Sequence, residues 1–251
     1  MIFLWGGIVM ELSKRIKEYW NERSDEFYSL RISELNSNKR SLWLKEIKNN
    51  FNNIDNEKLK ILDIGTGTGF FAVILTSLGH EVTGIDLCEN MISNAEYTAK
   101  SIGYNIDFKL MDAQKLEFED ESFDIIISRN LTWTLPDVKT AYKEWHRVLK
   151  KNGRLINFDA DYGNVSFSEE AKTLDINHAH AKIDSKILKE CDDIKSQLYV
   201  SRKLRPNWDI EVLNNIGFIN CKSDTKVSNR IYHDEDEFCN PTKMFSICAI
   251  K

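Results

Sequence analysis

The sequence predicts an α/β protein built on a doubly wound, mostly parallel sheet of seven strands. Between residues 59 and 160, short apolar runs alternate with amphipathic stretches of helix length. Such alternation predicts parallel strands joined by right-handed crossovers, with helices on both faces. The run Phe123–Ser128 is almost continuously apolar, as expected where both faces of a strand are covered. A glycine-rich turn follows the first of these runs directly.

That turn lies in Ile61-Leu-Asp-Ile-Gly-Thr-Gly-Thr-Gly-Phe70, where three glycines alternate with threonines. Glycine permits positive φ and lets the backbone approach a ligand closely. A strand, a tight turn and a helix start in this order predict a nucleotide-type ligand. Asp86 ends the next strand 17 residues after Gly69, near the spacing of about 20 expected for a ribose-binding acid. Phe70 stands where a dinucleotide fingerprint would need its third glycine.

Composition narrows the function classes. Of the 251 residues, 42% are hydrophobic and 29% charged, which is typical of a globular protein. The net charge of −5 provides no basic footprint for nucleic acid and disfavours an acidic membrane surface. The five cysteines are scattered without a C-x-x-C pair, so we expect reduced thiols in a cytoplasmic protein. These features favour a small-molecule partner and leave the oligomeric state open.

The first 51 residues predict a helical arm, because Leu12, Ile16 and Tyr19 recur at helical spacing. The arm either packs on the main domain or closes over the ligand as a lid. Residues 1–9 are apolar but too few to span a bilayer. We expect translation to start at Met10, which would make residues 1–9 non-native.

The remaining elements follow in order along the predicted domain 52–251. The predicted strands are 59–64, 81–86, 106–111, 123–128 and 154–159. The predicted helices are 70–78, 89–102 and 136–150, with Asn152-Gly153 closing the last one.

The C-terminal part of the chain begins with an inserted helical cap over 161–206, because apolar residues there recur without strands between them. Ser168 is the expected cap of its first helix. A helix over 209–216 ends at Gly217. Two β-rich segments, 218–227 and 243–250, are predicted to complete the sheet as an antiparallel pair at its edge.

Polar side chains gather at the ends of the predicted strands. They are Asp63, Asp86, Asp112, Asn130 and Asp159. Ligands of open parallel sheets bind beyond the carboxyl ends of the strands, where the strand order reverses. The shared position of these side chains therefore predicts a binding site at that edge.

These stretches resemble a class I S-adenosylmethionine-dependent methyltransferase of the small-molecule type, similar to the ubiquinone and menaquinone biosynthesis methyltransferases. The resemblance covers about 59–160 and, more loosely, the last two strands. It rests on Leu62–Gly69, Gly84-Ile-Asp86, Met111-Asp-Ala113, Phe123–Asn130 and Trp145–Leu155. In the last stretch Lys151-Asn152 replaces a Pro-Gly pair. The resemblance implies a Rossmann-like methyltransferase fold and S-adenosylmethionine as the cofactor.

The resemblance also implies a set of cofactor-binding residues: Asp63, Gly65, Thr66, Gly67, Gly69, Asp86, Leu87, Asp112, Ala113 and Asn130. Asp63 and the glycine-loop backbone hold the methionine moiety. Asp86 accepts both ribose hydroxyls, and Leu87 packs against adenine.

The other implied contacts concern the two ends of the cofactor. Asp112 accepts the adenine amine, while the Ala113 backbone reads the ring edge. Asn130 lies beside the transferred methyl group. Carboxylates suit a diol and an amine because both are hydrogen-bond donors.

Methyl transfer from a sulfonium to a small-molecule N, O, C or S nucleophile is an in-line displacement with an excellent leaving group. Alignment and exclusion of water can therefore supply much of the catalysis without a general base. The sequence assigns no catalytic residue. The candidates are Asn130, Trp133, Asp159, Tyr19 and Tyr28.

Other polar residues receive structural interpretations. His178 and His180 are two residues apart and point to different sides of a helix, so we expect surface histidines and no metal site. Arg202 and Arg205 are expected on a solvated helix face, although an anionic substrate is the alternative.

Three alternative functions stay open at this point. One is an S-adenosylmethionine-binding protein without catalysis. The second is an NAD-dependent oxidoreductase, which Phe70 and Asp112 argue against. The third is a nucleic-acid methyltransferase. The acidic charge disfavours it, as does Ser128-Arg-Asn-Leu131 in place of an Asn-Pro-Pro-Tyr-type motif.

Overall fold

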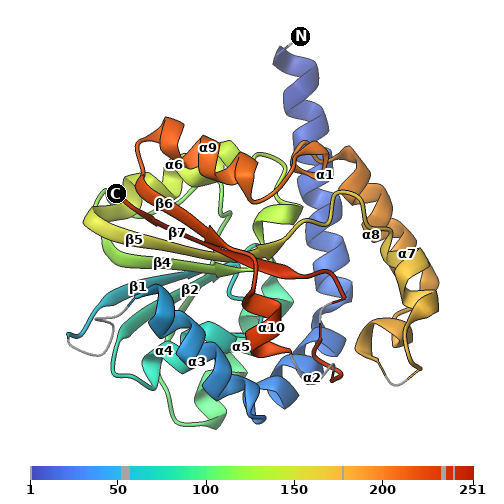
Figure 1. The fold of residues 1–251 in the computed structure, drawn as a ribbon, viewed down its shortest axis with the longest axis horizontal. Helices are drawn as coiled ribbons and strands as arrows, with labels where there is room; N and C mark the ends of the chain where they lie inside the picture. The colour runs from blue at the N-terminus through green and yellow to red at the C-terminus, as the bar shows by residue number, and fades with distance from the viewer. Residues whose placement is uncertain (1, 52–56, 177, 233–235, 240) are drawn as a thin grey trace.

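The computed structural model describes residues 2–51, 57–176, 178–232, 236–239 and 241–251 (Figure 1). Its centre is a seven-stranded sheet of order β3-β2-β1-β4-β5-β7-β6. The strands are β1 (Lys60–Ile64), β2 (Glu81–Asp86), β3 (Asp107–Leu110), β4 (Phe123–Arg129), β5 (Leu149–Ala160), β6 (Ile219–Asp224) and β7 (Met244–Ile250). All neighbours are parallel except β7, which runs antiparallel to both β5 and β6. The predicted fold class is confirmed.

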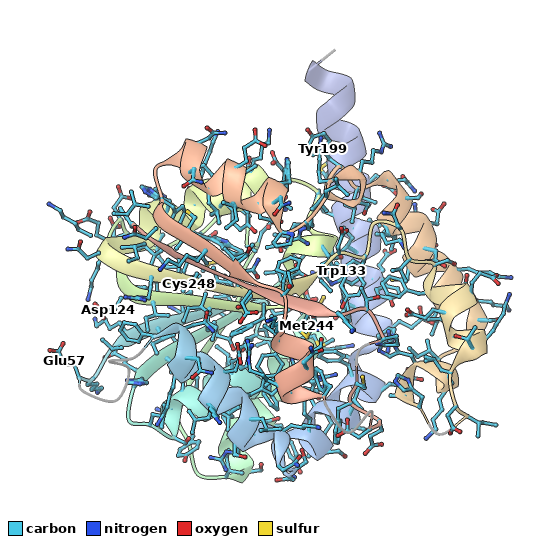
Figure 2. The ribbon with its side chains drawn as sticks, in the orientation of Figure 1. Glu57, Asp124, Trp133, Tyr199, Met244 and Cys248 are labelled. Carbon is cyan, nitrogen blue, oxygen red and sulfur yellow. The ribbon has the colours of Figure 1, made fainter. Side chains whose placement is uncertain are left out.

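Helices cover both faces of this sheet, and side chains fill the space between the helices and the strands (Figure 2). The helices are α3 (Lys39–Asn50), α4 (Phe70–Thr76), α5 (Glu89–Ser101), α6 (Val138–Val148), α9 (Asn207–Ile216) and α10 (Val227–Ile231). Figure 1 shows α6 and α9 over one face and α3, α4 and α10 over the other. The strand order reverses between β1 and β4, which makes the carboxyl ends of these two strands the expected place for a ligand.

Residue patterns explain these elements. The consecutive isoleucines 125–127 of β4 are buried, because helices cover both faces of the strand. Helix α6 buries one stripe, made of Val138, Ala141, Tyr142, Trp145 and Val148. The Asp137 side chain caps its first turn by accepting a hydrogen bond from the Thr140 amide.

The arm consists of α1 (Ile2–Glu22), α2 (Ser24–Leu35) and α3, and it packs between the sheet domain and a helical segment. That segment contains α7 (Phe167–Glu170), η2 (Ala171–Thr173), η3 (Ala179–Lys182), α8 (Ser185–Gln197) and η4 (Val200–Arg202). Helix α1 lies beside α8 (Figure 1), and Arg15 joins them through Glu190 and Asp193, both at 2.7 Å. No helix within the described ranges is both long and apolar enough to cross a lipid bilayer.

The buried Glu34 of α2 joins the arm to the sheet. Its carboxylate accepts hydrogen bonds from Trp43 Nε1 at 3.0 Å and from the Tyr232 hydroxyl at 3.1 Å. The Arg129 guanidinium, at the end of β4, donates to both carboxylate oxygens, at 2.9 and 3.1 Å. Arg31 donates to the same carboxylate. Arg129 also stacks 4.3 Å from the Trp43 ring. One side chain therefore connects α2, α3, β4 and the residue that follows α10.

The charge of Glu34 depends on its partners. Burial alone would raise its pKa, but the Arg129 and Arg31 guanidiniums outweigh burial and lower the pKa to about 2. The carboxylate is therefore fully ionised at neutral pH.

Two local expectations are wrong. Asn152-Gly153 does not close a helix, because α6 ends at Val148 and β5 begins at Leu149. The Asn152 amide, at φ 63°, instead donates to the Lys251 carbonyl at 2.9 Å. Ser168 does not cap a helix either. Ser166 caps α7, and the Ser168 hydroxyl donates to Asp192 at 2.7 Å.

Helix α10 was not expected. The segment 218–227 was predicted to be β-rich, but β6 ends at Asp224 and α10 begins at Val227. Val227 and Ile231 are buried on the side of α3 and β7, so packing overrides the weak local pattern. The boundary at 51/52 adjoins residues 52–56, which lie outside the described residues, and it stays a prediction. The same holds for the expected start at Met10. Residue 1 is outside the described residues, and 2–9 belong to α1.

We predict that Glu34→Gln lowers the free energy of unfolding by about 3–5 kcal/mol, because it leaves buried guanidiniums without their counter-charge. Denaturant unfolding at pH 7 measures this. Glu96→Gln, at an exposed position of α5, is the control and should change stability by less than about 0.5 kcal/mol.

The stability difference between wild type and Glu34→Gln should depend on pH. The folded pKa of Glu34 lies near 2, below its ordinary 4.5, so its stabilisation is complete above about pH 4.5 and is lost as the pH falls further. The stability difference between wild type and Glu34→Gln should shrink between pH 4.5 and pH 3. A difference that stays constant over this range would contradict the ion-pair assignment.

Candidate functional site

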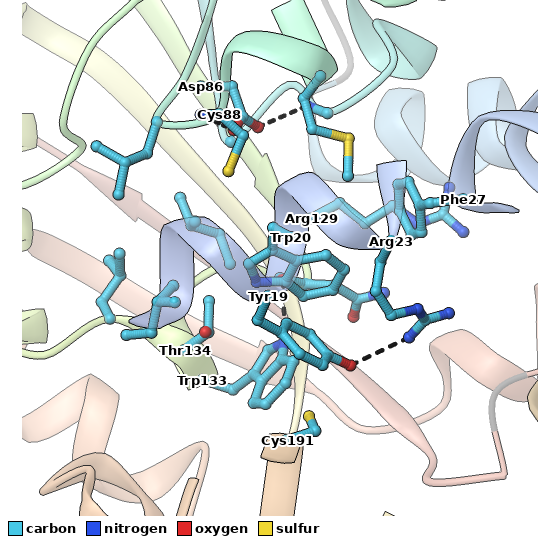
Figure 3. A pocket seen from close by; sticks show the side chains of 18 of the residues that line it. Tyr19, Trp20, Arg23, Phe27, Asp86, Cys88, Arg129, Trp133, Thr134 and Cys191 are labelled. Carbon is cyan, nitrogen blue, oxygen red and sulfur yellow. Dashed lines mark hydrogen bonds between the residues drawn. The ribbon is translucent and has the colours of Figure 1, made fainter. Parts of the chain in front are cut away.

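A cavity opens at the carboxyl ends of β1, β2 and β4, between the sheet, the arm and the helical segment (Figure 3). Gly67, Asp86 and Asn130 line it from the sheet, and Trp20 and Arg23 line it from the arm. A smaller cavity beside the glycine loop shares several of these lining residues, including Phe27 and Gly67. The site therefore lies where the strand order predicts it.

The glycine loop forms one wall. Gly65 and Gly67 have φ of 67° and 53°, which favour glycine. A Cβ on Gly67 would lie 3.3 Å from Phe27 Cε1, and one on Gly65 would lie 2.9 Å from Leu131. The absence of side chains therefore keeps the loop backbone open to the cavity.

Asp86 lies at the end of β2 and lines the cavity. One carboxylate oxygen accepts from the Gly67 amide at 3.0 Å, and the other accepts from the Cys88 amide at 3.0 Å. Burial raises the pKa of this carboxyl, and the two amides oppose the rise. The carboxylate is thus held rigidly between the strand end and the loop, with lone pairs left for a ligand.

The wall beyond Asp86 is mostly apolar. Leu87, Met91 and Met111 line it together with Ala113 and Asp112. Gln114 fixes the Asp112 carboxylate, because its amide and side chain both donate to Oδ1, at 2.8 and 3.1 Å. This combination suits a flat ring with a polar edge.

Asp63 is buried beside the smaller cavity. Its Oδ2 accepts from the Thr66 hydroxyl at 2.6 Å and from the Ala72 amide at 3.1 Å. Burial outweighs these hydrogen bonds and raises the pKa to about 7. Asp63 can therefore change its charge near neutral pH.

Asn130 follows β4 with φ 54° and lines both cavities. Its amide donates to the Phe158 carbonyl at 2.8 Å, and its carbonyl accepts from Trp133 Nε1 at 2.9 Å. The Tyr162 hydroxyl lies 3.5 Å from its Oδ1. Asn130 thus connects the glycine loop to the aromatic part of the cavity.

The structure brings only some of the other candidates to this cavity. Tyr19, Trp20 and Trp133 line it, and the Trp20 and Trp133 rings meet edge to face at 6.3 Å. Tyr28 packs on Tyr97 at 6.3 Å and does not line it.

Gly69 of the glycine loop was expected to contact the cofactor, but it lies away from both cavities. Gly69 lines neither cavity, and a Cβ there would lie 3.2 Å from Phe108. Its left-handed backbone instead begins α4. The Thr66 part of the loop borders the smaller cavity.

Asp159 belongs to a buried ion-pair network outside the cavity lining. Arg205 donates to Asp159 at 3.1 Å and to Asp209 at 2.9 Å. The side chains of Arg205 and Asp159 are both buried, at 2% and 0% exposure. The expectation of a solvated Arg205 is wrong. Asp159 also accepts from the Trp133 amide at 2.9 Å and from the Thr132 hydroxyl. It therefore supports the turn that carries Trp133.

The expectation of surface histidines is also wrong for His180, which lines the cavity. Its pKa is lowered to about 3, first by burial and then by His178, Arg23 and Arg31. His178 Nε2 lies 3.0 Å from the Cys239 carbonyl. Among the residues that the structure describes, no group of three or more His, Cys, Asp or Glu side chains is arranged to hold a metal ion.

Sequence reasoning missed two basic residues of the cavity, Arg23 and Arg31. A signal was available, since Arg23, Phe27 and Arg31 follow one another at intervals of four and share a helical face. The cap residues Glu170 and Cys191, also in the lining, carry no such signal.

Residues 62–157 match the family described as "Methyltransferase domain". The matched segment contains the glycine loop, Asp86, Asp112 and Asn130.

The segment 62–157 is therefore assigned as similar to a methyltransferase domain.

The relatives agree with this assignment. The chain is 31% identical to an uncharacterized methyltransferase, YcgJ, of Bacillus subtilis, over 62% of this chain and 60% of that protein. It is 28% identical to a ubiquinone biosynthesis O-methyltransferase of Pelagibacter ubique, over 58% and 60% of the two chains. The matches therefore span about 60% of the length of these curated relatives. Among solved structures, the PH0226 protein of Pyrococcus horikoshii matches 86% of this chain and 92% of its own, at a TM-score of 0.59 and 20% identity. That similarity is one of fold.

S-adenosylmethionine is the cofactor that the sequence resemblance implies, and the residues that line the cavity fit it. The glycine loop leaves room that a Cβ would fill, and the Asp86 carboxylate keeps free lone pairs at the cavity wall.

We predict that Asp86→Ala weakens S-adenosylhomocysteine binding about ten- to a hundredfold, since hydrogen bonds to a charged acceptor contribute about 1.5–3 kcal/mol. Isothermal titration calorimetry measures the affinity. Glu81→Gln, at the exposed opposite end of the same strand, is the matched control and should bind as wild type does. Unchanged affinity in a folded Asp86→Ala protein would remove Asp86 from the site.

Proposed function

We propose that this chain transfers the methyl group of S-adenosylmethionine to an N, O, C or S nucleophile of a small molecule. One observation carries the proposal: the cofactor-type wall of glycine loop, Asp86 and Asp112 continues into an aromatic chamber. Trp20 comes to that chamber from the arm, Trp133 from the turn after β4, and Phe167 from the helical segment. A single cavity would thus hold both donor and acceptor.

The cofactor would lie along the sheet edge. Asp86 would accept from the ribose hydroxyls, and Leu87 would cover one face of adenine. Asp112 and the Ala113 backbone would read the adenine edge. This distribution is supported by the apolar wall beside Asp86 and by the fixed Asp112 carboxylate.

The methionine end would lie at the glycine loop. Asp63 would interact with its ammonium group, while the loop backbone from Gly65 to Gly67 would follow the chain of the ligand. Arg31, which borders both cavities, would balance the carboxylate. The bound cofactor supplies a sulfonium methyl group with a good leaving group.

The residues of this chain would act mainly by alignment and by exclusion of water. The Trp20, Trp133, Tyr162 and Phe167 rings enclose the chamber with edge-to-face and tilted contacts. Asn130 sits between chamber and glycine loop and would orient the acceptor. The division into an arm of 1–51 and a sheet domain of 52–251, with 161–206 as its cap, belongs to this proposal.

Tyr19 would act as a neutral hydrogen-bonding group. Burial raises the pKa of its phenol far above neutral, although Arg23 opposes the rise. A phenolate is therefore absent at pH 7, and Tyr19 is not a general base. An amine acceptor would need no base, since its lone pair is free when neutral.

The direct test is calorimetry with S-adenosylhomocysteine, S-adenosylmethionine and NAD side by side. We expect the first two to bind and to raise the melting temperature by mass action. Stabilisation by NAD without stabilisation by S-adenosylhomocysteine would overturn the proposal. Binding without methyl transfer to any of a panel of small-molecule acceptors would favour a catalytically silent binding protein.

Cofactor affinity should depend on pH through Asp63. Its pKa near 7 in the free protein means that it is protonated below pH 7, whereas a ligand ammonium favours the ionised form. The affinity for S-adenosylhomocysteine should fall about tenfold from pH 8 to pH 6. Calorimetry in buffers of different ionisation enthalpy should also show proton release at pH 6.

Asp63→Asn is the control for this dependence. It should bind more weakly but with an affinity that no longer changes between pH 6 and pH 8. A wild-type affinity that is flat over the same range would refute the contact between Asp63 and the ammonium group.

A further inference from the structure

The wall of the cavity formed by the arm carries a cation, Arg23, to which the proposed cofactor placement assigns no role. Arg23 follows the end of α1 and lines the larger cavity but not the smaller one beside the glycine loop. Its Nη1 donates to the Tyr19 hydroxyl at 3.1 Å, a contact visible in Figure 3. The guanidinium therefore has a fixed position next to the aromatic chamber.

Arg23 is poorly compensated for a buried charge. Its side chain is 12% exposed, and its buried Nε has no hydrogen-bond partner among the described residues. The described carboxylate within ion-pair range is that of Glu26, at 3.8 Å, on a side chain that is 57% exposed. A buried charge and a buried unpaired donor both cost free energy unless a partner satisfies them.

A second arginine strengthens the positive potential at this end. Arg31 is 11% exposed, and its buried Nε also has no hydrogen-bond partner in the described part of the chain. Its ion-pair partner, Glu34, is shared with Arg129. Two guanidiniums therefore face one carboxylate, and a positive charge remains.

The imidazole of His180 lies in the same positive potential. The pKa of His180 falls to about 3, mainly because of burial, and His178, Arg23 and Arg31 contribute to the same fall. Neutral His180 can donate a hydrogen bond to an anion in the cavity. Glu170 and Glu237 also line the cavity, and burial raises the pKa of Glu170.

We propose that Arg23, with Tyr19 and His180 beside it, binds an oxyanion of the methyl acceptor, a carboxylate or a phosphate monoester. That the bound molecule is the methyl acceptor rests on the proposed function, whereas the existence of the anion site does not. A guanidinium presents donors in a planar fork that fits either oxyanion. Trp20, Trp133 and Phe167 would hold the apolar body of the same molecule. Arg31, which borders the glycine loop, serves the cofactor carboxylate and adds to the potential.

The test uses the full chain saturated with S-adenosylhomocysteine, titrated at constant ionic strength with benzoate, phenyl phosphate and neutral benzamide. We expect at least one of the two anions to bind ten times or more tighter than benzamide. Arg23→Gln should weaken that anion roughly ten- to a hundredfold and abolish the preference over benzamide, while S-adenosylhomocysteine affinity is retained. Arg31→Gln should instead weaken S-adenosylhomocysteine. Arg40→Gln, an exposed arginine of α3, is the control without effect.

The outcomes separate the two proposals. A preference for phenyl phosphate or for benzoate identifies the oxyanion. Equal binding of benzamide, or an unchanged preference in folded Arg23→Gln, overturns the anion site while leaving the methyltransferase proposal intact. If the protein does not bind S-adenosylhomocysteine but still binds the anion through Arg23, the anion site is supported and the proposed function is overturned.

A second variant is needed if Arg23→Gln does not fold. Arg23→Lys keeps the charge but loses the planar fork of donors, and it should bind the anion several-fold more weakly. Wild-type anion affinity in Arg23→Lys and in Tyr19→Phe would then overturn the site.

Discussion

The buried carboxylate of Glu34 is the contact on which the shape of the cavity depends. It gathers Arg129 from the end of β4, Trp43 from α3 and Tyr232 from the end of α10. A buried charge is tolerated only when its hydrogen bonds are nearly complete, so these elements can adopt few relative positions. Because Glu34 lies on α2, the same contacts hold the arm over the carboxyl ends of the sheet. The arm in turn brings the Trp20 ring to the aromatic chamber, where it meets Trp133.

This arrangement divides the cavity by charge. Acids at strand ends, Asp86 and Asp112, form the wall suited to the hydroxyls and amine of an adenosine. Arginines of the arm, Arg23 and Arg31, line the same cavity, as do Glu170 and Glu237. Aromatic rings and Asn130, which carry no charge, line it as well. A donor and an acceptor of different polarity could therefore occupy one cavity in a single relative orientation, which is what an in-line displacement requires.

Buried ion pairs also explain why some strand-end residues support the site without lining it. Asp159 has the sequence position of a ligand-binding acid, yet Arg205, 46 residues away, neutralises it. The pair fixes Thr132 and the Trp133 amide and so shapes the turn after β4. Sequence position alone does not distinguish such an acid from Asp86, because the difference lies in which cation the tertiary structure brings to it.

The sequence by itself determined the sheet, its parallel core and the location of the cofactor wall. Continuous apolar runs such as that of β4, and the glycines at 65 and 67, are local features whose geometry follows from sterics and burial. Tertiary structure alone decided the rest. Leu149 begins β5 because it pairs with Phe123 of β4, Val227 begins α10 because α10 packs against α3 and β7, and Arg205 becomes buried because Asp159 pairs with its charge. Arg23 and His180 reach the same cavity from segments more than 150 residues apart. Contacts of that range depend on how helices pack around the sheet, and no local pattern encodes them.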